Sequence, residues 1–107
     1  MNTIRRYRTE DGHEWVTEWL DHLKDRVAKA RIHARILRLA LGNFGDCKPV
    51  RGGVAELRVD FGPGYRVYYG VVDKTVVLLL CGGDKSSQDA DIIRAVTCLE
   101  DFKRRVT

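Results

Sequence analysis

The stretch ELRVDFGPGYRVYYGVV, residues 56–72, alternates apolar and polar side chains in two runs that Gly62-Pro63-Gly64 separates. Period-two alternation is typical of a β-strand with one buried and one exposed face. The two runs therefore predict an antiparallel β-hairpin. We expect its buried face to carry Leu57, Val59, Val67 and Tyr69, and its open face to carry Arg58, Arg66 and Tyr68.

The pairing of these two strands follows from the requirement that the apolar residues share one face. Those residues are all odd-numbered, so the numbers of two facing residues must have an even sum. A three-residue loop, 62–64, satisfies this condition and is a common hairpin loop. The resulting register places Asp60 opposite Arg66, and Arg58 opposite Tyr68.

Two helices are expected between residues 11 and 42. Asp11 and Asp25 stand where helix caps are favoured, and apolar residues recur at helical spacing after each of them. The link between the helices is short, which predicts an antiparallel helical hairpin. In the second helix the spacing assigns the buried stripe to Val27, Ala30, Ala34, Leu37 and Leu41, widened by Ile32, Ile36 and Leu39.

Residues 75–81, TVVLLLC, do not alternate, which predicts a central strand covered on both faces. We expect Gly82-Gly83 to end this strand and Ser86 or Ser87 to begin a last helix. Residues 3–8 predict a short edge strand, and residues 43–53 a loop. The order predicts one α+β domain over residues 1–107, in which a short N-terminal strand, a helical hairpin, a three-stranded antiparallel sheet and a C-terminal helix follow one another. The helices are expected on one face of the sheet.

The composition indicates a folded protein with a mild excess of positive charge. Of its 107 residues 44% are apolar and 32% charged, and the net charge of +4 suggests a polyanionic partner. The longest apolar run, 76–81, is too short to span a membrane, and residues 1–8 lack the apolar segment of a signal peptide, so we expect a cytoplasmic protein without membrane contact. The wide spacing of the three cysteines and three histidines predicts no metal site.

The second helix also carries a line of arginines, Arg31, Arg35 and Arg38. Such a line is either an ordinary solvated helix face or a ladder for the phosphates of a nucleic acid. Lys48 and Arg51 in the following loop join these arginines as candidate RNA-binding residues.

Two segments, FGDCKPVRGGVAELRVDFGPGYRVYYG (44–70) and LLLCGGDKSSQDADIIRA (78–95), resemble the RelE/ParE superfamily of bacterial toxin–antitoxin toxins. The nearest branch is the HigB-like, phage-derived group of addiction-module killer proteins, and the resemblance covers nearly the whole chain. It implies a RelE-like fold and a cytoplasmic bacterial toxin neutralised by a cognate helix-turn-helix antitoxin, through which alone operator DNA is bound. Relatives of the RelE kind enter the ribosome and cut mRNA without a metal, whereas ParE-like relatives inhibit DNA gyrase.

The resemblance implies that Arg58, Arg66 and Lys85 form the functional set and that no cofactor is needed. Metal-independent RNA cleavage requires a base for the ribose 2′-hydroxyl, cations for the phosphate and an acid for the leaving 5′ oxygen. The two arginines suit the phosphate. Neighbouring cations are expected to lower the pKa of Lys85, a candidate base, and of Tyr68, a candidate acid.

Three functions remain open at this point: a ribosome-dependent mRNA endonuclease, a non-enzymatic gyrase inhibitor of the ParE kind, and a non-toxic RNA-binding regulatory protein. The sequence has no tyrosine after Tyr69, and its histidines all lie between residues 13 and 33, away from the arginine face. Both departures from the studied RelE pattern modestly favour the gyrase inhibitor. A plain ion-paired surface, in which Asp60 neutralises Arg66, is the alternative to a functional face.

Overall fold

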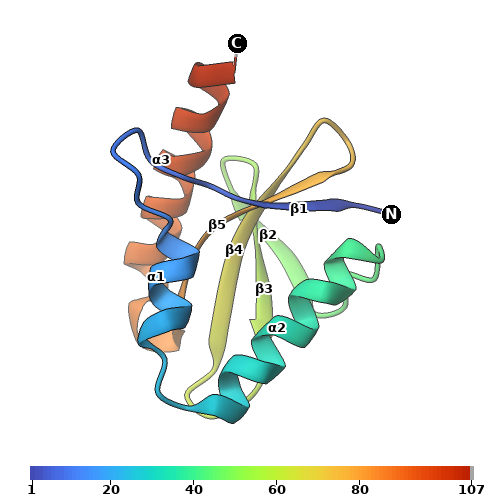
Figure 1. The fold of residues 1–107 in the computed structure, drawn as a ribbon, viewed down its shortest axis with the longest axis vertical. Coiled ribbons are helices and arrows are strands. Elements are labelled where there is room, and N and C mark those ends of the chain that lie inside the picture. Colours follow the sequence, from blue (N-terminus) through green and yellow to red (C-terminus); the bar gives the residue numbers. More distant parts are fainter. Residues whose placement is uncertain (107) are drawn as a thin grey trace.

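The computed structural model describes residues 1–106, which form a five-stranded mixed sheet with helices on both of its faces (Figure 1). The helices are α1 (Trp15–His22), α2 (Arg26–Ala40) and α3 (Gln88–Val106), and the single-turn helix η1 (Lys85–Ser87) precedes α3. The strands are β1 (Thr3–Arg6), β2 (Cys47–Arg51), β3 (Val54–Val59), β4 (Tyr65–Val72) and β5 (Val76–Asp84), in the spatial order β1-β5-β4-β3-β2.

The α+β class is confirmed, but the sheet is larger than the three antiparallel strands that were expected. β1 is an edge strand, as expected, and runs parallel to β5, while the other neighbours are antiparallel. Within residues 1–106, no helix combines the length and the apolar character that crossing a bilayer requires.

β2 occupies a stretch that was expected to be a loop. Gly52 and Gly53 have φ of +61° and +82°, the left-handed conformation that both central residues of a type I′ turn require. This turn pairs Arg51 with Val54 and so forms a second hairpin from β2 and β3. Pro49 cannot donate a ladder hydrogen bond, but it is tolerated because β2 lies at the edge of the sheet.

The β3–β4 hairpin has a different register from the expected one. Val59 pairs with Tyr65, which leaves residues 60–64 as the loop in place of residues 62–64. Arg58 consequently faces Arg66, and Asp60 lies in the loop instead of opposite an arginine. Both registers satisfy the even-sum condition, so the condition assigned the faces but did not select the loop length.

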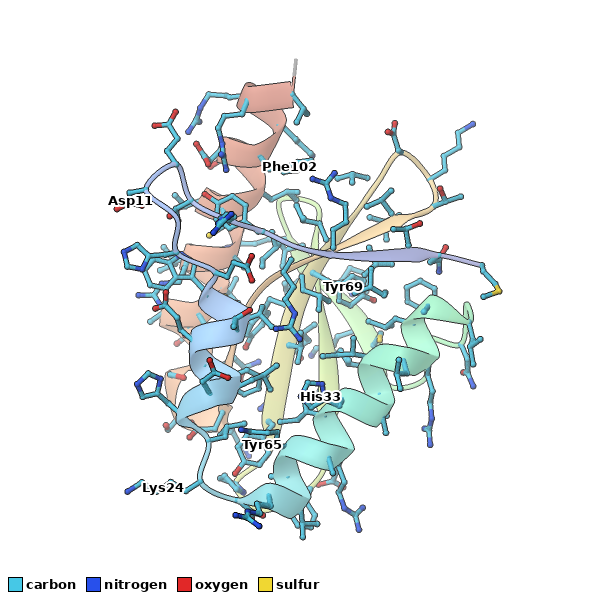
Figure 2. The ribbon with its side chains drawn as sticks, viewed as in Figure 1. Asp11, Lys24, His33, Tyr65, Tyr69 and Phe102 are labelled. Carbon is cyan, nitrogen blue, oxygen red and sulfur yellow. The ribbon has the colours of Figure 1, made fainter. Side chains whose placement is uncertain are left out.

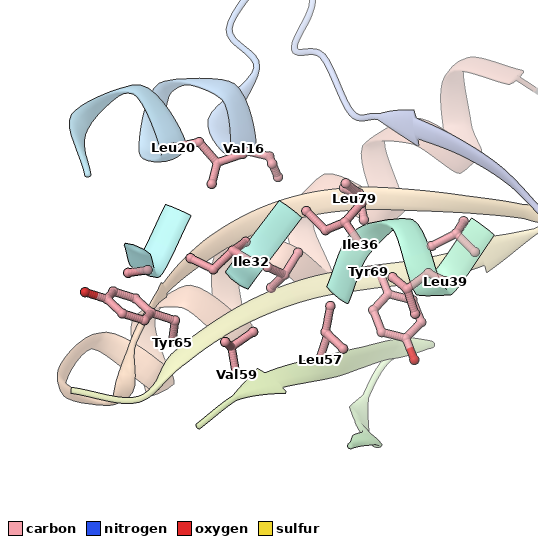
Figure 3. Packing of buried hydrophobic residues seen from close by; sticks show 13 residues of the cluster. Val16, Leu20, Ile32, Ile36, Leu39, Leu57, Val59, Tyr65, Tyr69 and Leu79 are labelled. Atoms are coloured by element: carbon pink, nitrogen blue, oxygen red, sulfur yellow. The ribbon is translucent and has the colours of Figure 1, made fainter. Parts of the chain in front are cut away.

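One face of the sheet packs against α1 and α2, as expected. Figure 3 shows Leu57 and Val59 of β3 facing Ile32 and Ile36 of α2 in the buried cluster. α1 lies against β5, whereas α2 lies against β3 and β1. The two helices diverge from their short link (Figure 1), so the expected antiparallel packing of a helical hairpin is wrong.

The helix caps differ between α1 and α2. Asp25 caps α2, as expected, because its carboxylate accepts the backbone N–H groups of Val27 and Ala28 at 3.0 and 3.1 Å. Asp11 does not cap α1, which begins after Glu14; its carboxylate accepts the hydroxyl of Thr9 instead.

The opposite face of the sheet is covered by α3, so the expectation of helices on one face is wrong. β5 is buried on both faces, as its apolar run predicted, but it continues through Gly82-Gly83 to Asp84. Polar side chains at 56, 66 and 68 had suggested an open face. The buried cluster on this side contains Val54, Tyr68, Leu78, Leu80 and Cys81 from the sheet and Ala95, Cys98 and Leu99 from α3.

α2 buries a different stripe from the expected one. Val27, Leu37 and Leu41 are 53%, 67% and 67% exposed. Two apolar stripes with helical spacing lie on opposite sides of this helix, so periodicity alone did not select between them. The side that packs on the sheet carries Ala28, Ile32, Ile36 and Leu39.

Gly82 and Gly83 allow helices on both faces to approach β5 closely. A Cβ on Gly82 would lie 2.3 Å from ring atom Cε3 of Trp19 in α1. A Cβ on Gly83 would lie 2.0 Å from Oδ2 of Asp91 in α3. Successive residues of a strand face opposite sides of the sheet, so Gly82 makes room for α1 and Gly83 makes room for α3.

We therefore expect Gly82→Ala to lower the free energy of unfolding by about 1–3 kcal/mol, the usual cost of overpacking a core. Urea denaturation measures this loss. Trp19→Leu shortens the obstructing side chain, so the penalty of Gly82→Ala should be smaller in that background. Equal penalties in both backgrounds would contradict the close approach of Trp19.

Candidate functional site

The three cations of the expected functional set meet at one end of the sheet, in a hollow of about 450 Å³. Tyr65, which also lines the hollow, marks this end of the sheet in Figure 2, away from the end of α3 that carries Phe102. We call this hollow the cationic hollow. Its charged lining consists of Arg58, Arg66, Lys85, Asp46 and Asp60, and the loop residues 62–64 also line it.

Three adjacent elements bring these cations together. The β3–β4 pairing sets Arg66 opposite Arg58, and Lys85 follows the end of β5 directly. Gly64 lies between Arg66 and Lys85. A Cβ on this glycine would lie 3.9 Å from both Nη1 of Arg66 and Cβ of Lys85. The carboxylate of Asp84 accepts the N–H of Ser86 at 2.8 Å, which fixes the turn that begins η1.

Arg58 is held by a carboxylate that the sequence analysis did not identify. Its Nε and Nη2 donate to Oδ1 of Asp46 at 3.1 and 2.9 Å. Asp46 directly precedes β2, and its carbonyl accepts the Arg58 N–H at 2.9 Å, so the edge hairpin sets the two residues side by side. The Arg58 side chain remains 39% exposed, which leaves it able to bind an anion from solvent.

Arg66 is held by the buried carboxylate of Glu56. Its Nε lies 3.5 Å from Oε2 of Glu56, and the two side chains are 12% and 0% exposed. Gln88, at the start of α3, donates to the same oxygen at 3.2 Å. A carboxylate that is removed from water costs several kcal/mol unless a cation and hydrogen bonds compensate it. Glu56 and Arg66 therefore depend on each other, and α3 encloses their contact.

The arrangement suits a phosphate. Arg58 and Arg66 face each other directly, and like charges in that position destabilise a sheet unless something compensates them. Asp46 compensates Arg58, and Glu56 compensates Arg66. Two guanidinium groups and the ammonium of Lys85 then face one hollow, where a phosphodiester would accept from all three. The described residues hold no cluster of three or more His, Cys, Asp or Glu side chains that a metal could use.

Tyr68 is not part of the cationic hollow. Its side chain is fully buried beneath α3, and its hydroxyl has no hydrogen-bond partner among the described residues. Burial, followed by the nearby carboxylates of Glu56 and Asp91, raises the pKa of this phenol above its ordinary value. The expected lowering of its pKa is therefore wrong, because these effects outweigh the opposing effect of Arg66.

The arginines of α2 do not form one phosphate ladder. Arg35 turns inward, and its Nη1 donates to the carbonyl of Arg58 at 2.7 Å, so it supports the hollow from behind. Arg31 is exposed, and its guanidinium lies over the ring of Phe61, 4.6 Å from the centroid. That ring belongs to the loop that borders the hollow, which places Arg31 beside the site.

The other candidate RNA contacts lie apart from these residues. Arg38 and Lys48 are exposed and do not line the hollow. Arg51, at the far end of β2, lines a separate hollow with Asp89 of α3. The structure thus unites Arg58, Arg66 and Lys85 but leaves the second group of residues dispersed.

Two buried tyrosines provide a matched test of the environment of Tyr68. Tyr68→Phe removes a hydroxyl without a protein partner, so the free energy of unfolding should stay unchanged or rise by up to about 1 kcal/mol. Tyr7→Phe removes a hydroxyl that donates to Oδ2 of Asp101 at 2.6 Å and should cost about 1 kcal/mol. Urea denaturation compares the two. An equal loss at both positions would contradict the placement of Tyr68.

Comparison with known proteins gives a relative but no described activity. No protein-family model matches the sequence. An uncharacterized protein of Haemophilus influenzae is 58% identical over 77 residues, which cover 72% of this chain and 78% of the relative. The chain therefore belongs to the same protein family as this Haemophilus influenzae protein.

Proposed function

We propose that the protein is the toxin of a type II toxin–antitoxin module, with a RelE-like fold, and that it cleaves mRNA on the ribosome without a metal. The observation that carries the proposal is the convergence of Arg58, Arg66 and Lys85 on one hollow. The resemblance to RelE/ParE toxins implies these same three residues as the functional set. Arg58 and Arg66 share one face of the β3–β4 hairpin, as their alternation predicts, and Lys85 joins them from the end of β5.

In the proposed reaction the ribose 2′-hydroxyl attacks the adjacent phosphate and expels the 5′ oxygen of the next nucleotide. Negative charge grows on the phosphate oxygens as the bond to the nucleophile forms. Arg58 and Arg66 donate hydrogen bonds to these oxygens, and their preset positions make the stabilisation effective. Asp46 and Glu56 hold the two guanidinium groups in place.

Two exposed groups of the hollow are suited to proton transfer, Asp60 and Lys85. A carboxylate suits the base that takes the proton of the 2′-hydroxyl, and an ammonium suits the acid that protonates the leaving oxygen. We assign Asp60 as the base and Lys85 as the acid. These assignments differ from the expected roles at both groups. Lys85 was the expected base and becomes the acid, because the hydroxyl of Tyr68, the expected acid, is buried, and Asp60 takes the role of the base.

The proposal implies the ribosome and mRNA as targets and a cognate helix-turn-helix antitoxin as the neutralising partner, with operator DNA bound through the antitoxin. The site of action is the bacterial cytoplasm. No cofactor takes part, because the RNA itself provides the nucleophile.

A second candidate function is non-enzymatic inhibition of DNA gyrase, as in ParE-like toxins. The observation that favours it is the position of His13, His22 and His33, none of which lines the cationic hollow, although some related toxins use histidine for acid–base chemistry. A supercoiling assay with purified gyrase separates the candidates. Inhibition by protein that leaves mRNA intact selects the second function, and absence of inhibition at saturating protein removes it.

Arg66→Ala should lower mRNA cleavage by about 10²–10³-fold, the usual effect of losing a group that stabilises charge in the transition state. Primer extension on mRNA from expressing cells should show new 5′ ends within codons for the wild type but not for Arg66→Ala. Arg58→Ala tests the same claim at a more exposed position, because Arg66→Ala also leaves Glu56 uncompensated.

Arg8→Gln is the matched control, because it removes one positive charge from an exposed residue whose carbonyl meets Arg105 of α3, away from the hollow. Its cleavage should equal that of the wild type. Stalled ribosomes without new 5′ ends, or full toxicity of both arginine variants, would contradict the proposal. Normal growth of wild-type expressing cells without antitoxin would favour the non-toxic RNA-binding protein.

A further inference from the structure

α2 carries a second apolar stripe on the side that turns away from the sheet. Its residues follow a spacing of three, four, three and four, by which one helix packs along another. Figure 1 shows no other helix or strand of residues 1–106 over this side of α2. We call it the outer stripe; it consists of Val27, Ala30, Ala34, Leu37 and Leu41, all of them exposed.

The outer stripe is not needed to hold α2 on the sheet. Ala28, Ile32, Ile36 and Leu39 on the opposite side already make that contact. Single exposed apolar residues are ordinary on a protein surface, but a continuous line along about four helical turns, roughly 20 Å, is typical of an interaction surface.

The charges beside the outer stripe define the chemistry of its partner. From Arg26 to Ala40 the chain contains no aspartate or glutamate. Helical geometry sets Arg31 and Arg38 along one border of the stripe and Arg26 along the other, and all three are exposed. A second copy of this chain would bring like charges together along the seam, which disfavours self-association. RNA would match the cations but leave the apolar line without a partner.

We propose that the outer stripe of α2 docks an acidic amphipathic helix of a partner protein. Apolar residues of that helix pack between Val27 and Leu41, and its flanking carboxylates pair with Arg31 and Arg38. No residue of the outer stripe lines the cationic hollow, so the inference does not depend on the chemistry proposed there.

Fluorescence anisotropy with a labelled synthetic helix tests the proposal. The probe is a peptide of three heptads with leucine at positions a and d and glutamate at e and g. Leu37→Ser should weaken its binding about tenfold or more, because the variant removes a large apolar contact. Ile93→Ser is the control, since it removes a 57%-exposed apolar residue from α3, and it should leave binding unchanged. Added salt should weaken binding to the wild type.

Several outcomes overturn the proposal. These are absence of binding to the wild type, equal binding to wild type and Leu37→Ser, and equal binding of a peptide in which lysine replaces glutamate. A wild-type dimer that Leu37→Ser dissociates in sedimentation equilibrium would assign the stripe to a second copy instead. Loss of RNA binding in Leu37→Ser, without binding of the acidic peptide, would assign it to RNA. None of these experiments measures mRNA cleavage, so failure of the docking proposal is distinguishable from failure of the proposed function.

Discussion

The contact between the buried carboxylate of Glu56 and the guanidinium of Arg66 fixes the arrangement of the candidate site. Glu56 is completely enclosed, so its charge requires a cation, and Arg66 stands 3.5 Å away. That contact holds Arg66 directly opposite Arg58 in spite of their like charges. Asp46, which directly precedes the edge strand β2, holds Arg58. One carboxylate therefore compensates each arginine, and both arginines still line the hollow.

Coverage of the sheet explains why this hollow lies at one end. α1 and α2 occupy one face and α3 the other, and Gly82 and Gly83 permit the close approach of helices on each side of β5. α3 begins only at Gln88, so the end of the sheet that holds Arg58 and Arg66 lies where the covering helix starts. Tyr68, beneath α3, is buried, whereas Arg58 and Lys85, near the start of this helix, remain accessible to a ligand.

Local sequence patterns predicted which residues share a face of the sheet, but they did not predict which elements cover each face. Alternation assigned the residues of β3 and β4 to the correct faces, but it cannot distinguish water from a helix distant in sequence, so Tyr68 was wrongly placed in solvent. Arg58, Arg66 and Lys85 were identified and do meet. Asp46 was missed because the Gly-Gly turn of residues 52–53, the signal for its hairpin, was assigned to a loop. The exposed stripe of α2 was mistaken for core because both stripes share one spacing.

Nuclear magnetic resonance can show whether the cationic hollow is the surface that holds RNA. A short RNA with 2′-deoxy substitutions, which cannot be cleaved, is titrated into ¹⁵N-labelled protein. We expect the largest shifts on the side-chain Nε–H groups of Arg58 and Arg66 and on the backbone N–H groups of Gly64 and Lys85. Largest shifts at Arg38 and Arg51, with the hollow unchanged, would contradict it.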